Sequence, residues 1–258
     1  MKISRDICEK EAKRISMLRM QLLGDHPFWG FLLMQLQIVP SRGIGAIAAT
    51  DCIRNIFYDP TETSKLTNKQ LGFVLLHELC HLAYATIPRQ LSRDHFLWNC
   101  ATDYAINRIV VSIPGMLGDA MYTPPRGILL DRKYDGMIAE TIYESLITDP
   151  PDFLKPLRIN IKIEDFNSKE EKDSVLEISG VMDHCGGIDI HLPIDLSDQD
   201  REDLESNLRA AVDYWNKSNK KGHIPGDIER EFSLNKSKID LRKVLMYQVN
   251  LSVEVEGY

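Results

Sequence analysis

The residues with the clearest chemistry are His77, Glu78 and His81, in the run His-Glu-Leu-Cys-His. An α-helix turns by about 100° per residue, so histidines four positions apart project from one face, one turn from each other. Two such imidazoles can bind one metal ion, and the glutamate beside the first can accept a proton from water without binding the metal itself. A zinc ion lowers the pKa of bound water from about 15.7 to roughly 7. The run therefore predicts a zinc site with Glu78 as general base.

A hydrolytic zinc site needs a third protein ligand and keeps its fourth position for water. Asp103 is the favoured candidate, because Asn99, Asp103 and Asn107 repeat every four residues along an otherwise apolar segment. A buried carboxylate is costly unless it is paired or binds a cation, and a zinc ion accounts for it directly. Neighbours on this segment are candidates for hydrogen bonds to the ligands, and they are Asn99, Thr102 and Asn107. The predicted metal ligands are His77, His81 and Asp103.

Other third ligands were weighed against Asp103. The extended metzincin pattern requires a glycine and a histidine where this chain has Tyr84 and Ile87, so that pattern is excluded. The remaining ligand candidates have less support from their surroundings, and they are Glu140, Glu144 and His95. His184 is instead a candidate for polarising a substrate carbonyl or stabilising an oxyanion. The alternative without a metal is a pair of helices in which the polar side chains form only hydrogen bonds with one another.

Two predicted helices position these residues. Thr67 and Gln70 have capping-box spacing, which predicts a helix that starts there, carries the His-Glu run and extends to about Ala85 before Pro88. A second helix is predicted from Asp94 to a point before the Pro-Gly pair at 114–115, and it carries Asp103.

The other predicted elements form the surroundings of this pair. Alternating and apolar runs predict strands at 44–50 and 55–58, ahead of the His-Glu helix. Helical spacing of apolar residues predicts further helices, at 3–23, 137–147, 197–219 and 238–247. The expected fold class is α+β and zincin-like, mainly helical with a small sheet preceding the helix of the His-Glu run. We expect a single domain over residues 1–258.

Composition narrows the class of protein. The hydrophobic fraction of 43% and the charged fraction of 27% are those of a globular protein, and the net charge of −7 argues against a nucleic-acid partner. The five cysteines are odd in number and form no Cys-x-x-Cys pair, so no disulfide framework is expected. No apolar run has the length of a membrane span, and no signal peptide is recognisable at the start. We therefore expect a cytoplasmic protein that has no contact with a membrane.

Several segments together resemble a known family, the putative metallopeptidase domain of bacteria and their phages that usually precedes a von Willebrand factor A-like domain. The likeness spans most of the chain. It rests on PFWGFLLMQLQIVP, AATD followed by NIFYDP, LLHELCHLAY, RDHFLWNCATDYAIN, HIPGDIEREF and KIDLRKVLMYQV. The family pattern implies a HExxH zinc site completed by an aspartate on the following helix, and these positions match His77, Glu78, His81 and Asp103.

The resemblance also has implications beyond the site. Cys52 stands where family members often carry a glycine, and Thr86 stands where they often carry a further histidine, so that histidine has no counterpart here. The von Willebrand-like domain would begin where this chain stops, which implies either a fragment or a stand-alone form. The family further implies an AAA+ ATPase of the MoxR type or a von Willebrand factor A-like domain as a partner.

The predicted function is that of a zinc-dependent peptidase that binds a peptide or protein substrate. The same activated water can attack other carbonyl or amide compounds, so a non-peptide hydrolase remains an alternative. A second alternative is a catalytically idle zincin-like module that acts through contacts with AAA+ or von Willebrand-like partners.

Overall fold

The computed structural model describes residues 5–113, 122–154 and 196–218, together with Gly222, Ile224 and Ile228. The chain divides into two compact units, residues 1–223 and 224–258, and only two residues of the second unit are described. The helix predicted at 238–247 and the candidate residue His184 lie outside the described residues. The single domain over 1–258 therefore stays a prediction.

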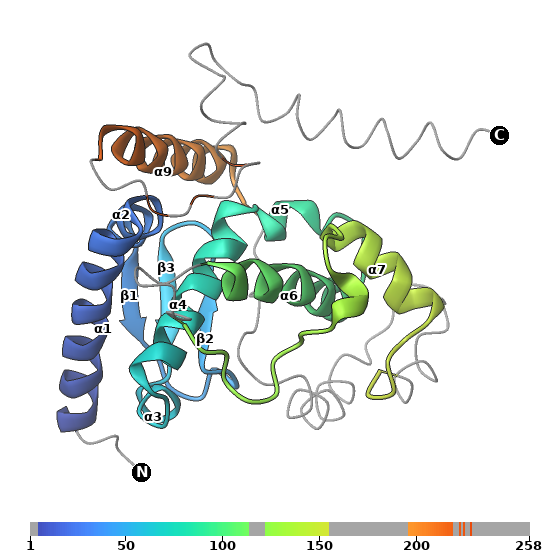
Figure 1. Ribbon diagram of the computed structural model, residues 1–258, viewed down its shortest axis with the longest axis horizontal. Helices are drawn as coiled ribbons and strands as arrows, with labels where there is room; N and C mark the ends of the chain where they lie inside the picture. Colours follow the sequence, from blue (N-terminus) through green and yellow to red (C-terminus); the bar gives the residue numbers. More distant parts are fainter. Residues whose placement is uncertain are drawn as a thin grey trace. The chain divides into compact units, whose positions relative to one another are not determined.

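The described part of the first unit is mainly helical, with one small sheet that precedes the helix of the His-Glu run (Figure 1). The predicted α+β fold class is confirmed. In chain order the described elements are α1 Arg5–Asp25, α2 Pro27–Gln35, β1 Gln37–Pro40, β2 Ala48–Thr50, β3 Asn55–Tyr58, α3 Pro60–Thr63, α4 Asn68–Ala83, α5 Thr86–Arg89, α6 His95–Ser112, the 3-10 helix η1 Arg132–Tyr134, α7 Ala139–Thr148 and α9 Asp198–Lys217.

The sheet has the strand order β1-β3-β2, with β1 parallel and β2 antiparallel to β3. The strand predicted at 55–58 is confirmed. The strand predicted at 44–50 is too long, because Gly43 and Gly45 adopt φ angles of 61° and 75° and the extended run begins only at Ala48. Strand β1 was not predicted. It forms the last part of the apolar segment whose first part forms α2, and its Gln37 pairs with Asn55.

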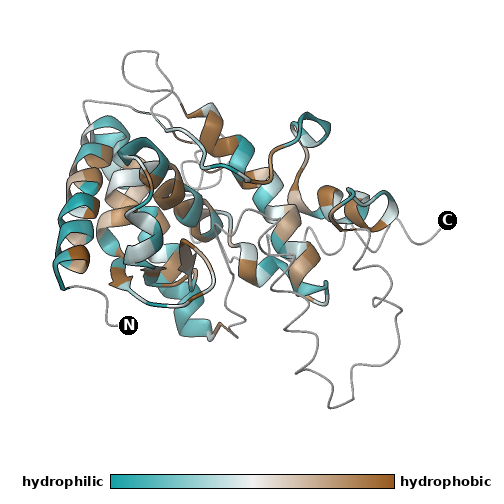
Figure 2. Cartoon of the chain, turned by 90° about the horizontal axis from the view of Figure 1, so that it is seen from below, coloured by the Kyte–Doolittle hydropathy of each residue, from teal (hydrophilic) through white to brown (hydrophobic). Residues whose placement is uncertain are grey.

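Helices α1 and α2 form a tightly packed pair beside the sheet. The opening helix predicted at 3–23 is confirmed from Arg5, where the described residues begin, and it extends two residues further than predicted, to Asp25. Figure 2 shows hydrophilic and hydrophobic residues mixed along α1, at the left of the view, and its buried positions include Ile15, Leu18 and Leu22. In α2, Gly30 lies against the backbone of α1, since a Cβ atom there would stand 2.1 Å from the Cα of Leu23. No other residue type fits at this contact.

Gly30→Ala is expected to lower the free energy of unfolding by about 3 kcal/mol or more, because the added methyl group meets backbone atoms that cannot rotate away. Urea denaturation followed by circular dichroism measures the change. Gly24→Ala is the matched control, since nothing lies within 4 Å of a Cβ at that helical position and alanine favours helix by up to about 1 kcal/mol. Equal midpoints for Gly30→Ala and the wild type would contradict this account of the contact.

Helix α4 carries the His-Glu run through the interior. The predicted capping box is confirmed, because the Thr67 side chain accepts from the Gln70 N–H and the Gln70 side chain accepts from the Thr67 N–H. Every residue from Leu71 to Ala83 is buried. The helix ends two residues earlier than the predicted Ala85, because Ala85 adopts the left-handed conformation with φ 48°. The chain then enters the short helix α5, which was not predicted.

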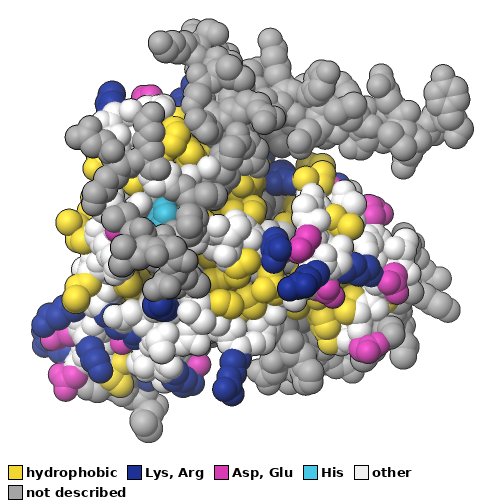
Figure 3. Space-filling view, viewed as in Figure 1, with side chains coloured by type: hydrophobic (Ala, Val, Ile, Leu, Met, Phe, Trp, Pro, Cys, Tyr) yellow, Lys and Arg dark blue, Asp and Glu magenta, His cyan; other side chains and the backbone are white. Residues whose placement is uncertain are grey.

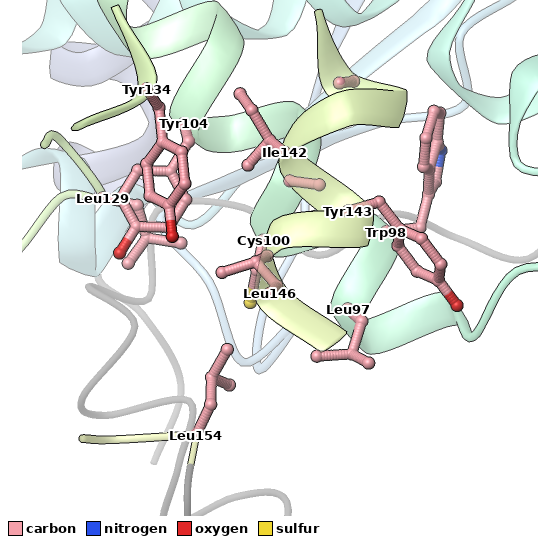
Figure 4. Packing of buried hydrophobic residues seen from close by; sticks show 12 residues of the cluster. Leu97, Trp98, Cys100, Tyr104, Leu129, Tyr134, Ile142, Tyr143, Leu146 and Leu154 are labelled. Atoms are coloured by element: carbon pink, nitrogen blue, oxygen red, sulfur yellow. The ribbon is translucent and has the colours of Figure 1, made fainter. Parts of the chain in front are cut away.

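Helix α6 is held by a hydrophobic cluster that it shares with α7 (Figure 4). The ring centroids of Tyr104 and Tyr134 lie 4.6 Å apart, and those of Trp98 and Tyr143 lie 6.2 Å apart. Asp94 caps α6 as predicted, since its carboxylate accepts from the Leu97 N–H at 2.8 Å. This packing fixes the rotation of α6 about its axis, and with it the direction in which the other face projects.

Two further predicted helices are confirmed, with ends within two residues of those expected. Helix α7 begins at Ala139, and α9 begins after Ser197, whose side chain caps it. Helix α9 packs on α2, where the rings of Phe31 and Tyr214 stack with centroids 4.5 Å apart. Among the described residues, no helix is both long and apolar enough to cross a membrane. On the face drawn in Figure 3, basic and acidic side chains are interspersed.

Candidate metal centre

The three predicted ligands meet where α4 packs against α6. One ligand atom from each of His77, His81 and Asp103 lies within 4.8 Å of the other two. The two histidine Nε2 atoms are 2.9 Å apart. The Oδ1 atom of Asp103 is 3.6 Å from Nε2 of His77 and 3.3 Å from Nε2 of His81. The spacing of four within α4 and the position of Asp103 on α6 thus produce the convergence that the sequence predicted.

The cluster lies in the interior of the protein. His77 and His81 have no exposed surface, and the side chain of Asp103 is 9% exposed. Removing charged and polar groups from water to this degree is costly unless they are paired or bind a cation. Among the three predicted ligands, Asp103 alone has an exposed part of its side chain, and its Oδ1 atom, which faces the histidines, is buried.

Asn107 fixes the tautomer of His77. The Nδ2 atom of Asn107 donates to the main-chain oxygen of Leu129 at 3.0 Å, which leaves its Oδ1 atom to face His77 Nδ1 at 2.9 Å. An amide oxygen only accepts, so Nδ1 of His77 carries the proton. In the neutral ring the Nε2 atom of His77 then carries the lone pair and faces the cluster, as metal-binding histidines require.

Thr86 does the same for His81. Its hydroxyl lies 3.3 Å from the main-chain oxygen of His81 and 3.1 Å from Nδ1 of the same residue. The carbonyl can only accept, so the single hydroxyl proton goes there and the hydroxyl oxygen accepts from Nδ1–H. In the neutral ring the Nε2 atom of His81 therefore also carries the lone pair.

These assignments place three electron-rich atoms against one another in a buried site. With both rings neutral, two imidazole lone pairs at 2.9 Å and a carboxylate oxygen within 3.6 Å of each repel one another unless positive charge lies between them. Ligands about 2.0–2.1 Å from a tetrahedral zinc ion are roughly 3.3 Å apart, which falls within the observed range of separations. The nitrogen and oxygen donors also suit zinc. The residues present therefore fit a bound metal ion.

Glu78 follows His77 on α4 and has no exposed surface. Both of its carboxylate oxygens are buried as well. It directly follows His77 on α4 and is not one of the three converging residues. A carboxylate so placed can take up and release a proton next to the metal site.

The other candidate ligands lie elsewhere. Glu140 forms an ion pair with Arg89, with contacts down to 2.6 Å, and Glu144 is exposed on α7. His95 lies 3.0 Å from the side-chain oxygen of Gln90. Among the described residues, His77, His81 and Asp103 form the only group of three or more His, Cys, Asp or Glu residues able to hold a metal ion.

The three polar neighbours of Asp103 on α6 differ in their hydrogen-bond partners. Of the three residues that were candidates for hydrogen bonds to the ligands, Asn107 does contact a ligand, His77. Thr102 instead donates its hydroxyl to main-chain oxygens of its own helix, at Trp98 and Asn99. The side-chain oxygen of Asn99 is buried and has no hydrogen-bond partner among the described residues. Asn107 is therefore the member of this set that orients a predicted ligand.

The ion pair of Glu140 has a consequence for stability. Burial acts to raise the pKa of Glu140, but the hydrogen bonds and charge of Arg89 outweigh it, so the pKa lies below its ordinary value. A carboxyl group with a lowered folded-state pKa stabilises the fold above its unfolded pKa, and this contribution is lost as the pH falls through the folded pKa.

Glu140→Gln is therefore expected to lower the free energy of unfolding by about 1–2 kcal/mol at neutral pH. The difference from the wild type should shrink below about pH 4, where the carboxyl becomes protonated. Urea denaturation at both pH values measures it. Zinc affinity should not change, and a loss of zinc affinity in this variant would instead identify Glu140 as a ligand.

The family comparison agrees with this geometry. The sequence profile of a family described as "Putative metallopeptidase domain" matches residues 10–237. The chain belongs to this family. The match includes all three predicted ligands and Glu78, and the mainly helical α+β fold with its small sheet is compatible with a zincin-like metallopeptidase. Comparisons with curated proteins and with solved structures give no match.

Thr86 is the site residue that sequence reasoning did not identify. It was noted only as the position where family members often carry a histidine, and no role followed from that difference. The signal is weak because a threonine five residues after a histidine reaches back to it only if the chain reverses. Here the reversal depends on the left-handed conformation of Ala85, which alanine rarely adopts.

Proposed function

We propose that this protein is a zinc-dependent peptidase. The observation that carries the proposal is the convergence of two imidazole Nε2 atoms of α4, the helix that also holds Glu78, with the Asp103 carboxylate of α6. Membership of the metallopeptidase family supports the same reaction class. In this proposal His77, His81 and Asp103 hold the zinc ion, and Asn107 orients the His77 ring.

Zinc, when bound, lowers the pKa of a water molecule and polarises the carbonyl group of the substrate. Glu78 accepts the proton of the attacking water and then donates it to the nitrogen of the departing amine, so that the same carboxylate serves as base and as acid. The buried position of Glu78 strengthens its interaction with the charge that develops in the site.

The test begins with metal analysis of purified protein and continues with cleavage of a proteome-wide peptide library. We expect one zinc ion per chain, cleavage that stops after chelation, and recovery when zinc is added back. A zinc-loaded protein that cleaves no peptide would favour the idle binding module. A protein that takes up no zinc, with a proton shared between His77 and His81 in its place, would overturn the proposal.

A further inference from the structure

Thr86 occupies a corner of the chain that folds back over the last turn of α4. Helix α4 ends at Ala83, Ala85 is left-handed with φ 48°, and Thr86 then begins α5. The residue is 1% exposed. A buried threonine hydroxyl requires hydrogen-bond partners, and two partners of the Thr86 hydroxyl belong to His81.

The two bonds hold the ring of His81 relative to its own backbone. The hydroxyl joins the main-chain oxygen of His81, at 3.3 Å, to Nδ1 of its ring, at 3.1 Å. One group thereby fixes both the tautomer of the ring and its rotation about the side-chain bonds. Rotation of the ring would move Nε2 away from the Nε2 atom of His77 and from Asp103.

Thr86 is itself anchored to the helix that carries the third ligand. The indole N–H of Trp98 on α6 donates to the main-chain oxygen of Thr86 at 2.9 Å. Trp98 is 1% exposed, and the guanidinium of Arg93 lies 5.0 Å from its ring centroid. This rigid ring ties the corner to α6. Thr86 therefore connects His81 on α4 to the helix that holds Asp103.

The thiol of Cys52 also contacts the Thr86 hydroxyl. The Sγ atom of Cys52 lies 4.0 Å from the Thr86 hydroxyl oxygen. Cys52 adopts φ 54° in the turn after β2, where its N–H donates to the Thr50 hydroxyl at 3.0 Å. The carboxylate of Asp51 accepts from the next N–H groups of the same turn, including that of Ile53. The turn thus places the thiol against Thr86.

We propose that Thr86 is a positioning residue for His81, which orients the His81 lone pair for the metal ion and thereby sets the metal affinity. The inference rests on the proposed metal function. Groups that hydrogen-bond to metal ligands contribute about 10–100-fold to metal affinity, and Thr86 makes two bonds to one ligand. Loss of the hydroxyl leaves the His81 ring free to rotate and its Nδ1–H without an acceptor.

Thr86→Val tests the proposal, because valine keeps the shape of threonine and removes the hydroxyl. We expect zinc affinity, measured by competition with a chromophoric chelator, to fall about 10–100-fold. The visible absorption of the cobalt-substituted protein should also change, since it reports the arrangement of the ligands. Thr86→Ser retains the hydroxyl and should therefore keep the zinc affinity and the cobalt spectrum of the wild-type protein.

Thr102→Val is the matched control. Thr102 is also fully buried, and its hydroxyl bonds only to main-chain oxygens of α6. We expect this variant to lose some thermal stability while keeping wild-type zinc affinity and the wild-type cobalt spectrum. If Thr86→Val does not fold, Thr86→Ala carries the same test, with apoprotein unfolding as the check of integrity.

The outcomes separate this inference from the proposed function. A wild-type protein that binds neither zinc nor cobalt would overturn the metal function itself. Tight wild-type binding, matched by folded Thr86→Val or Thr86→Ala with the same affinity and spectrum, would overturn only the role of Thr86. An equal loss in Thr102→Val would show that general packing, and not the bond to His81, determines the affinity.

Discussion

The His81→Ala variant is expected to purify without stoichiometric zinc, whereas the wild-type protein should carry one ion per chain. His81 supplies one of three converging donors, and its Nε2 lies 2.9 Å from that of His77. With His77 and Asp103 alone, only two protein ligands remain, one fewer than hydrolytic zinc sites use. Elemental analysis after dialysis, followed by zinc titration of the apoprotein, measures the loss.

The same variant should lose the stabilisation that zinc gives to the fold. An ion that binds only the folded state at 1,000 times its dissociation constant adds about 4 kcal/mol to the free energy of unfolding. His81→Ala should not show this increase, so its thermal transition should be the same in zinc and in chelator. In chelator the cost of the substitution should be much smaller, because removing one of three crowded acceptors offsets part of the lost packing.

His95→Ala is the control for this comparison. His95 is half-buried at the start of α6, lies 3.0 Å from the side-chain oxygen of Gln90 and is not part of the cluster. It should keep full zinc content and the full response of its stability to zinc. Zinc binding by His81→Ala with wild-type stoichiometry and affinity would show that His81 is not a ligand.

Local sequence rules were sufficient for the two helices that carry the site. The capping box at Thr67 placed the start of α4, and Asp94 placed the start of α6. The spacing of four brought His77 and His81 onto one face. Asp103 was predicted because a carboxylate among apolar residues needs a partner, and this reasoning depends on burial and not on the detailed packing.

The remaining features depend on contacts that sequence spacing does not encode. The apolar segment at 28–36 fits a strand or a helix equally well by composition, and it forms α2 because Gly30 lets it approach α1. Strand β1 exists because β3 offers it a partner. The stripe of Asn99, Asp103 and Asn107 is one feature in sequence, yet only its last two members reach the histidines.

The Glu78→Gln variant is expected to keep its zinc and to lose most of its peptidase activity. Glutamine preserves the size and polarity of the side chain but cannot take a proton from water at neutral pH. A positioned general base contributes typically about 100- to 10,000-fold to the rate, and kcat should fall by that factor. The wild-type protein is first used to select cleavable peptides from the library. The kcat for these peptides and the zinc content are then compared between Glu78→Gln and the wild type.

Two comparisons make this expectation specific to proton transfer. Glu144→Gln makes the same chemical change on the exposed face of α7 and should leave kcat unaltered. Wild-type cleavage by zinc-loaded Glu78→Gln would exclude Glu78 as the base and leave the metal site intact.

Combining Glu78→Gln with His81→Ala separates a shared role from two independent ones. If Glu78 acts only on water that the metal has activated, its removal costs nothing further once the metal is lost, because residues that work as a unit are not additive. The double variant should then be no slower than His81→Ala alone. Multiplied losses would mean that Glu78 also stabilises the reaction without the metal, as a buried charge in its own right.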